Sequence, residues 1–184
     1  MSPLSLTISI AVLMTCTILP RETEAKTFEA CELAQYLAGK GEINKKDIPT
    51  WVCIATKESN RNTGAVSPLD PDGSRDHGIF QINDRYWCTA SGPAGKGCNA
   101  QCSSFENDDI SDDVSCIAKI YAETAKLSGN GFTGWSTYQF CNSPDKVNPY
   151  VAGCNYRPEK ETFFTFLNYM NDIFKKLLYR VWIG

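Results

Sequence analysis

Residues 47–58 read Asp47-Ile48-Pro49-Thr50-Trp51-Val52-Cys53-Ile54-Ala55-Thr56-Lys57-Glu58 and predict an amphipathic helix. The first turn carries an acidic residue and an early proline, both typical of a helix start. One helical face, at the spacing i, i+3, i+4, i+7, holds Trp51, Ile54, Ala55 and Glu58. The carboxyl of Glu58 therefore falls on the apolar side of the helix, where ionisation is costly and a proton is retained toward neutral pH.

A second carboxyl follows in different surroundings. Residues 72–83 read Asp72-Gly73-Ser74-Arg75-Asp76-His77-Gly78-Ile79-Phe80-Gln81-Ile82-Asn83, an apolar/polar alternation flanked by glycine and small polar residues that predicts a β-hairpin. Hydroxyls, amides and solvent can stabilise the anion of Asp76 there. A neutral carboxyl beside a charged one is suited to cleaving an acetal through an oxocarbenium-like transition state. Taken singly, each carboxylate could instead be a solvated surface group.

Six motifs surround this pair of carboxyls. They read Cys31-Glu32-Leu33-Ala34, Trp51-Val52-Cys53-Ile54-Ala55, Glu58-Ser59-Asn60, Asp72-Gly73-Ser74-Arg75-Asp76, Gly78-Ile79-Phe80-Gln81-Ile82-Asn83 and Tyr86-Trp87-Cys88. Over residues 26–154 they closely resemble the c-type (chicken-type) lysozymes, glycoside hydrolase family 22, and most of all the insect members. The resemblance gives Glu58 the role of general acid and Asp76 that of nucleophile or stabiliser. Lysozymes are the reference example of this chemistry, so the mechanism comes from the resemblance.

The order of expected elements indicates an α+β fold. We expect helices at 28–38, 47–58 and 111–126, a small antiparallel sheet within 60–87, a glycine-rich loop at 90–101 and a short helical piece at 135–140. A helical lobe and a small sheet lobe would then meet at a cleft, as the resemblance also implies.

The first 25 residues, Met1 to Ala25, predict a cleaved signal peptide and hence secretion. An apolar stretch from Leu4 to Leu19 precedes the small residue Ala25, although no Lys or Arg stands before it. A transmembrane helix is the alternative, but the stretch is short and Pro20 follows it. We expect three segments: a signal peptide at 1–25, a lysozyme domain at 26–157 and a C-terminal extension at 158–184.

Nine cysteines become eight once Cys16 leaves with the signal peptide, and an even number suits a secreted, disulfide-bonded chain. The sequence alone does not choose among the possible pairings. The resemblance selects Cys31 with Cys154, Cys53 with Cys141, Cys88 with Cys102, and Cys98 with Cys116. A zinc site is the competing interpretation, which the lack of a CxxC pair and the single histidine disfavour.

The cleft residues are also taken from the resemblance. Aromatic positions of the lysozyme cleft match Tyr86, Trp87 and Trp135, and polar positions match Gln81 and Asn83, although each could be an ordinary core residue. We expect Trp135 to serve in both ways, since an indole beside Glu58 would raise the pKa of that carboxyl. His77 departs from the pattern, because an aromatic residue is usual at its position.

A second constellation lies between Cys102 and Cys116 and overlays the calcium loop of α-lactalbumin and the calcium-binding lysozymes. Its ligands would be the side chains of Asn107, Asp112 and Asp113 with the carbonyls of Ser104 and Asp109, a set of hard oxygens. The first carboxylate of the family pattern is an amide here, which removes one charge. Alternatively, Asp109 or Ser111 caps the following helix while Asp112 and Asp113 complement its dipole.

The C-terminal extension has no counterpart in the family pattern. Large apolar residues step by four and three through Phe163, Leu167, Met170, Phe174, Leu177 and Val181, which predicts an amphipathic helix beginning near Pro158. Asp172, Lys175 and Arg180 interrupt the apolar run, so it is not a membrane span. Such a face should be buried, and we rank docking on the lysozyme body or on another copy above a membrane surface.

The predicted activity is hydrolysis by a secreted muramidase of β-1,4 links between N-acetylmuramic acid and N-acetylglucosamine in peptidoglycan. Chito-oligosaccharides are further candidate substrates; no cofactor is required, calcium would be structural, and no nucleic-acid partner is expected. The net charge is −3, so the long-range attraction of strongly basic antibacterial lysozymes is absent. Bacterial defence and digestion both remain open. The alternative is a glycan-binding or regulatory homologue without turnover.

Overall fold

The computed structural model describes residues 25–156. Its helices and strands are, in order, α1 (Ala30–Ala38), η1 (Lys45–Asp47), α2 (Ile48–Ser59), β1 (Asp76–His77), β2 (Ile82–Asn83), β3 (Cys88–Thr89), β4 (Ala100–Gln101), η2 (Cys102–Glu106), α3 (Ser111–Ser128), η3 (Gly131–Gly134), η4 (Ser136–Phe140), α4 (Pro144–Val147) and η5 (Asn148–Val151), where η denotes a 3₁₀ helix. All but the last residue of the expected signal peptide, and the whole expected C-terminal helix, lie outside this range.

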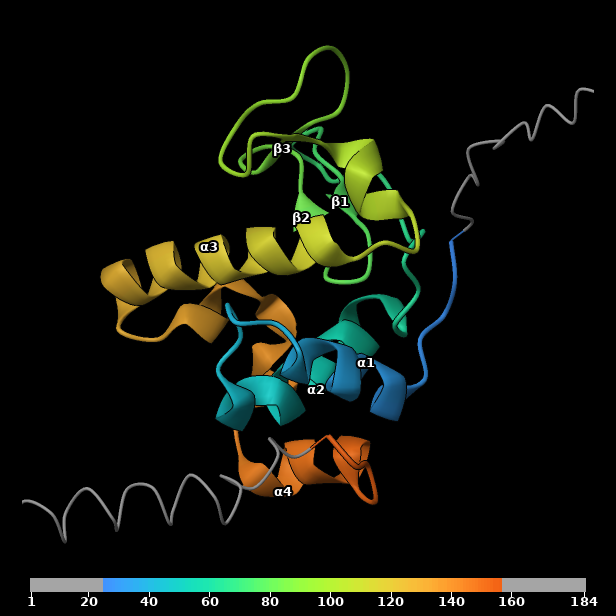
Figure 1. Cartoon of the computed structure of the whole chain (residues 1–184). Helices are drawn as coiled ribbons and strands as arrows, with labels where there is room; N and C mark the ends of the chain where they lie inside the picture. The colour runs from blue at the N-terminus through green and yellow to red at the C-terminus, as the bar shows by residue number, and fades with distance from the viewer. Residues whose placement is uncertain (1–24, 157–184) are drawn as a thin grey trace, which may run out of the picture.

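The arrangement is the expected α+β fold. Figure 1 shows α3 running across the middle, with the strands and their loops on one side and α1, α2 and α4 on the other. β1 and β2 pair antiparallel, with Asp76 opposite Asn83 and His77 opposite Ile82. Among residues 25–156, no helix is both long enough and apolar enough to cross a membrane.

The long helices begin and end close to where their sequences predict. α2 has Pro49 in its first turn and ends at Ser59, where Asn60, with a φ of 52° in the left-handed region, caps the helix. α3 runs two residues past the expected Lys126 and stops before Gly129, whose φ is 80°. α1 starts at Ala30, not at Phe28, because the chain there is still extended and the Glu32 carboxylate accepts a hydrogen bond from the Glu29 amide at 3.3 Å.

The sheet lobe differs from expectation in one respect. The glycine-rich loop at 90–101 ends in β4, which pairs parallel to β3 through Cys88 with Ala100 and Thr89 with Gln101. Each strand in this lobe is only two residues long. Such short ladders supply little pairing energy, so the lobe depends on its side chains and disulfides.

Four disulfides join the pairs that the resemblance implies: Cys31–Cys154, Cys53–Cys141, Cys88–Cys102 and Cys98–Cys116. The first two span 123 and 88 residues and close the helical lobe, whereas the last two span 14 and 18 residues around the sheet lobe. His77 lies near Cys88 and Cys102, but a cysteine binds zinc only as a thiolate and these two sulfurs are bonded to each other.

An aromatic cluster around the buried Trp51 forms the centre of the core. The ring of Trp51 lies 4.9 Å from those of Phe132 and Trp135, 5.9 Å from Phe80 and 6.0 Å from Tyr121, measured between centroids. These residues come from five separate stretches of chain. Their edge-to-face and tilted packing joins α2 to the hairpin loop, α3, η3 and the residue before η4.

Close packing of the hairpin onto η2 requires a glycine at position 78. Gly78 has a φ of +75°, and a Cβ there would lie 2.0 Å from the Phe105 carbonyl oxygen and 2.8 Å from Asp113 Oδ1. Gly73, with a φ of +82°, has nothing within 4 Å of the same position. The two glycines therefore share a backbone requirement, but only Gly78 has a steric one.

We predict that Gly78→Ala destabilises the protein by about 3 kcal/mol or more, the sum of left-handed backbone strain and overpacking. Gly73→Ala, the matched control, should cost only the roughly 1 to 2 kcal/mol of the backbone term. Urea unfolding of both variants measures the difference. Equal losses would show that η2 yields easily to the added methyl group.

Candidate functional site

One pocket gathers most of the residues that the sequence singles out. Glu58, from the last turn of α2, and Asp76, from β1, line it together with Gln81, Asn83, Trp87 and Trp135. Further lining residues are Ile82, Ile120, Gly134 and Ser136. Tyr86 is not among the residues that line this pocket; the residue is 62% exposed and its ring lies beside Arg85. The two carboxyls thus share a cavity with aromatic and amide side chains.

The pKa of Glu58 is raised, because burial disfavours the carboxylate. Thr137 opposes this effect: its hydroxyl donates a hydrogen bond to Glu58 Oε1 at 2.5 Å, which stabilises the anion. The negative charge of Asp76 raises the pKa of Glu58 further. Thr137 is a residue that sequence reasoning missed, since nothing local in the motif signals a contact across 79 positions.

Asp76 is held by its neighbour across the hairpin. The side-chain amide of Asn83 donates to Asp76 Oδ1 at 2.8 Å, and the Asp76 amide donates to Ser67 Oγ at 2.8 Å. The Asn83 bond lowers the pKa of Asp76, but burial outweighs it and the net shift is upward. The structure therefore adds burial to the polar surroundings that the sequence predicts for this carboxylate.

Trp135 belongs to the core and to the pocket at once. It is 6% exposed, packs edge-on against Trp51, and its indole NH donates to the Phe80 carbonyl at 2.9 Å. Because that bond crosses from the start of η4 to the hairpin loop, it fixes the indole between the two lobes. The same residue lines the pocket with Glu58, as expected for an apolar wall beside the buried acid.

The first turn of α3 contains a buried carboxylate without compensation. Asp113 is 0% exposed, and within the described part of the chain neither of its oxygens has a hydrogen-bond partner. Burial, followed by the charge of Asp112, raises the pKa of Asp113 well above its usual value. A hard cation would satisfy such oxygens, so the donor set fits calcium at this carboxylate.

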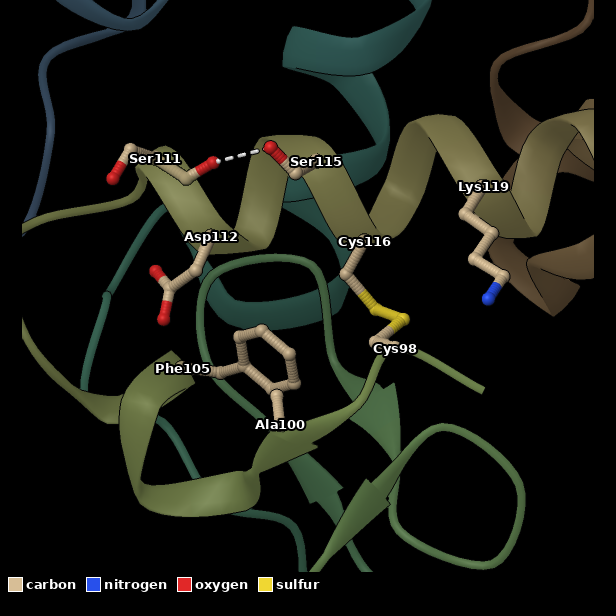
Figure 2. Close-up of a pocket in the computed structure, with 8 residues that line it drawn as sticks. All are labelled: Cys98, Ala100, Phe105, Ser111, Asp112, Ser115, Cys116 and Lys119. Carbon is tan, nitrogen blue, oxygen red and sulfur yellow. Dashed lines mark hydrogen bonds between the residues drawn. A yellow bond between two sulfur atoms is a disulfide. The ribbon is translucent and has the colours of Figure 1, made fainter. Parts of the chain in front are cut away.

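The other candidate calcium ligands are arranged less favourably. The Asn107 side chain donates to the Ser104 carbonyl at 2.8 Å and accepts from the Asp109 amide at 2.8 Å, so internal bonds use its oxygen and one carbonyl of the set. Asp109 Oδ1 accepts from the Ser111 amide at the start of α3, as the helix-capping alternative predicts. Figure 2 shows Asp112 directed toward a pocket beside Phe105 and the Cys98–Cys116 disulfide, with Lys119 at its other end.

Comparison with known proteins agrees with this fold. Residues 26–154 match the model of the C-type lysozyme/alpha-lactalbumin family. The chain is 40% identical over 149 residues to lysozyme c-1 of Anopheles gambiae, covering 80% of this chain and 96% of the relative. It is 38% identical over 139 residues to lysozyme X of Drosophila melanogaster, covering 73% of this chain and 88% of the relative.

Two solved structures are similar over the same region. The lysozyme from Litopenaeus vannamei has a TM-score of 0.62 and 36% identity, covering 71% of this chain and 98% of its own. The calcium-binding lysozyme from equine milk has a TM-score of 0.59 and 32% identity, covering 71% and 99%. Because the family model matches residues 26–154, which make up most of the chain, the chain belongs to the C-type lysozyme/alpha-lactalbumin family.

Proposed function

We propose that this chain is a secreted muramidase that hydrolyses the β-1,4 link between N-acetylmuramic acid and N-acetylglucosamine in peptidoglycan. The observation that carries the proposal is the placement of Glu58 and Asp76 in one pocket, with the pKa of Glu58 raised by burial. Membership of a lysozyme family supports the substrate class. The family also includes lactalbumins, so a glycan-binding homologue without turnover is the alternative.

In the proposed reaction, Glu58 is protonated in the free enzyme and donates its proton to the glycosidic oxygen as the bond to the leaving sugar breaks. Asp76, held by Asn83, faces the positive charge that develops at the sugar and acts as nucleophile or electrostatic stabiliser. Trp87 supplies an aromatic surface for sugar rings, and Gln81 and Asn83 line the same pocket. Clearing of a cell-wall suspension, followed from roughly pH 3 to pH 8, tests the activity.

Glu58→Gln should lower hydrolysis by about 10²-fold or more while chito-oligosaccharide binding, measured by calorimetry, stays near wild type. The amide keeps the shape of the side chain but has no proton to donate. Asp76→Asn should also cause a large loss. The exposed Glu42→Gln is the matched control and should retain full activity. Substantial hydrolysis by folded Glu58→Gln would assign the acid role to another residue and favour the binding-only alternative.

Thr137→Val should move the alkaline limb of the pH–rate profile to higher pH. The hydroxyl bond lowers the pKa of Glu58, so its removal raises that pKa and keeps the acid protonated over a wider range. Valine preserves the volume of the side chain. Thr133→Val, an exposed threonine whose hydroxyl bonds to the Asn130 carbonyl, is the control and should leave the limb in place. A limb that moves to lower pH would contradict the assignment of Glu58 as the acid.

We further propose that calcium binds the 104–113 loop, with Asp112 and Asp113 as its charged ligands, Asn107 as a neutral one and the Ser104 and Asp109 carbonyls completing the set. The buried, unpartnered carboxylate of Asp113 is the observation that favours this. The equine neighbour is a calcium-binding lysozyme by its title. Calcium would neutralise the charge of Asp113 and stabilise the start of α3, and the hydrolytic steps above do not require it.

Calcium should raise the melting temperature of the wild type relative to a chelator, since a ligand at about 100 times its Kd adds about 2.7 kcal/mol. Asp113→Asn removes the uncompensated charge, so it should melt higher than wild type in chelator and lose the calcium response. Asp108→Asn, in the same loop but outside the proposed ligand set, should keep the response. Wild-type melting curves that coincide in calcium and chelator would leave helix capping as the better account of this loop.

A further inference from the structure

His77 follows Asp76 in β1, and its side chain points to the opposite face of the strand. Neighbouring side chains of a β-strand point to opposite faces, so when Asp76 lines the pocket, the imidazole is directed to the back of β1. It is 5% exposed there. A buried imidazole calls for polar partners.

Two carboxylates from different parts of the chain supply these partners. Nδ1 of His77 lies 2.7 Å from Oε1 of Glu106, the last residue of η2, and Nε2 lies 3.6 Å from Oδ2 of Asp84, just beyond β2. The first is a hydrogen bond in which the imidazole NH donates. The second is too long for a hydrogen bond, and among the described residues Nε2 has no hydrogen-bond partner. The Asp84 side chain is largely shielded from solvent, whereas the Glu106 side chain is 34% exposed, so the pair with Glu106 is partly screened and acts mainly through its hydrogen-bond geometry.

Asp84 also restrains the residue on the other side of Asp76. Its Oδ1 accepts a hydrogen bond from the Arg75 amide at 3.0 Å, and its own amide donates to the Arg75 carbonyl at 2.8 Å. The backbone of Asp76 therefore runs between Arg75, which Asp84 holds, and His77, which Glu106 holds. With the peptide fixed on both sides, the Asp76 carboxylate has little freedom beyond its own side-chain torsions.

We propose that His77 is a positioning residue for Asp76, which it holds in register with Asn83 by tying β1 to Glu106 of η2 and to Asp84. The expected change in kcat rests on the proposed hydrolase function. The contacts of His77 with Glu106 and Asp84 do not depend on it. The imidazole also acts on the charge of Asp76: it lowers the pKa of that carboxyl, which burial, Asp70 and Asp84 raise. The charge of Asp76 in turn raises the pKa of Glu58.

Two substitutions separate hydrogen bonding from space filling. His77→Phe keeps a ring of similar size without polar atoms, whereas His77→Asn loses the ring but places an amide nitrogen near Nδ1, within reach of Glu106. We expect His77→Phe to lower kcat about 10-fold with KM nearly unchanged, since misplacing a reacting group costs rate more than binding. His77→Asn should recover most of this loss. Glu42→Gln, an exposed charge change, is the control.

A second measurement does not depend on turnover. It monitors by NMR the side-chain amide of Asn83, which donates a hydrogen bond to Asp76. Its proton–nitrogen NMR signals should shift in His77→Phe and stay close to wild type in His77→Asn. Should His77→Phe fail to fold, Glu106→Gln serves instead, with a smaller loss of kcat and a smaller shift of the same signals. If wild-type protein does not hydrolyse cell walls, the proposed function fails and the NMR comparison alone decides.

The proposal is overturned if folded His77→Phe, or Glu106→Gln in its place, keeps the wild-type kcat and the wild-type Asn83 signals. It is equally overturned if His77→Phe is active and His77→Asn is not, because packing rather than hydrogen bonding would then be the role of the ring. A lower melting temperature with both readouts unchanged marks His77 as structural only and counts against it.

Discussion

The packing of Trp51 against Trp135 is the contact on which the arrangement of the two lobes depends. Trp51 belongs to α2, the helix that also carries Glu58, while Trp135 precedes η4 and is tied to the hairpin loop by its indole NH. This aromatic contact therefore helps to set the distance between α2, which carries Glu58, and the loop between β1 and β2, which follows Asp76. A smaller residue at either position would leave a cavity at the junction itself, where the cost is both stability and geometry.

Burial acts on both carboxyls, and hydrogen bonds decide how they differ. Desolvation is the largest effect at Glu58 and at Asp76 and raises both pKa values. A hydrogen bond from Thr137 partly stabilises the Glu58 anion, and one from Asn83 partly stabilises the Asp76 anion. The mutual repulsion of two carboxylates in one pocket favours a state in which only one is charged. The charge of Asp76 is among the effects that raise the pKa of Glu58, and Asp has the lower intrinsic pKa, so both effects favour Glu58 as the proton donor of the proposed reaction.

Local sequence patterns predicted the positions of the helices well. They did not predict contacts between residues far apart in the sequence. The position of Glu58 on the apolar face of α2 follows from a spacing of seven residues, and α3 ends within two residues of the expected Lys126. The parallel pairing of β3 with β4, the Thr137 bond to Glu58 and the Glu106 bond to His77 join residues 12 to 79 positions apart. No periodicity records such contacts, because only the folded chain brings the partners together. The cysteine pairs were available only through resemblance to a known family, for the same reason.

Three consecutive residues connect the cleft with the 104–113 loop. Asp76 lines the pocket, His77 bonds to Glu106 within that loop, and Gly78 has no Cβ where one would meet Phe105 and Asp113. A charge buried at Asp113 therefore acts on the segment that carries Asp76, not on a distant surface. The loop cannot relax away from this charge without loosening β1, and β1 cannot shift without disturbing Asn83. Neutralising Asp113, by a cation or by a proton, thus stabilises the back of the same strand whose front presents the carboxylate to the cleft.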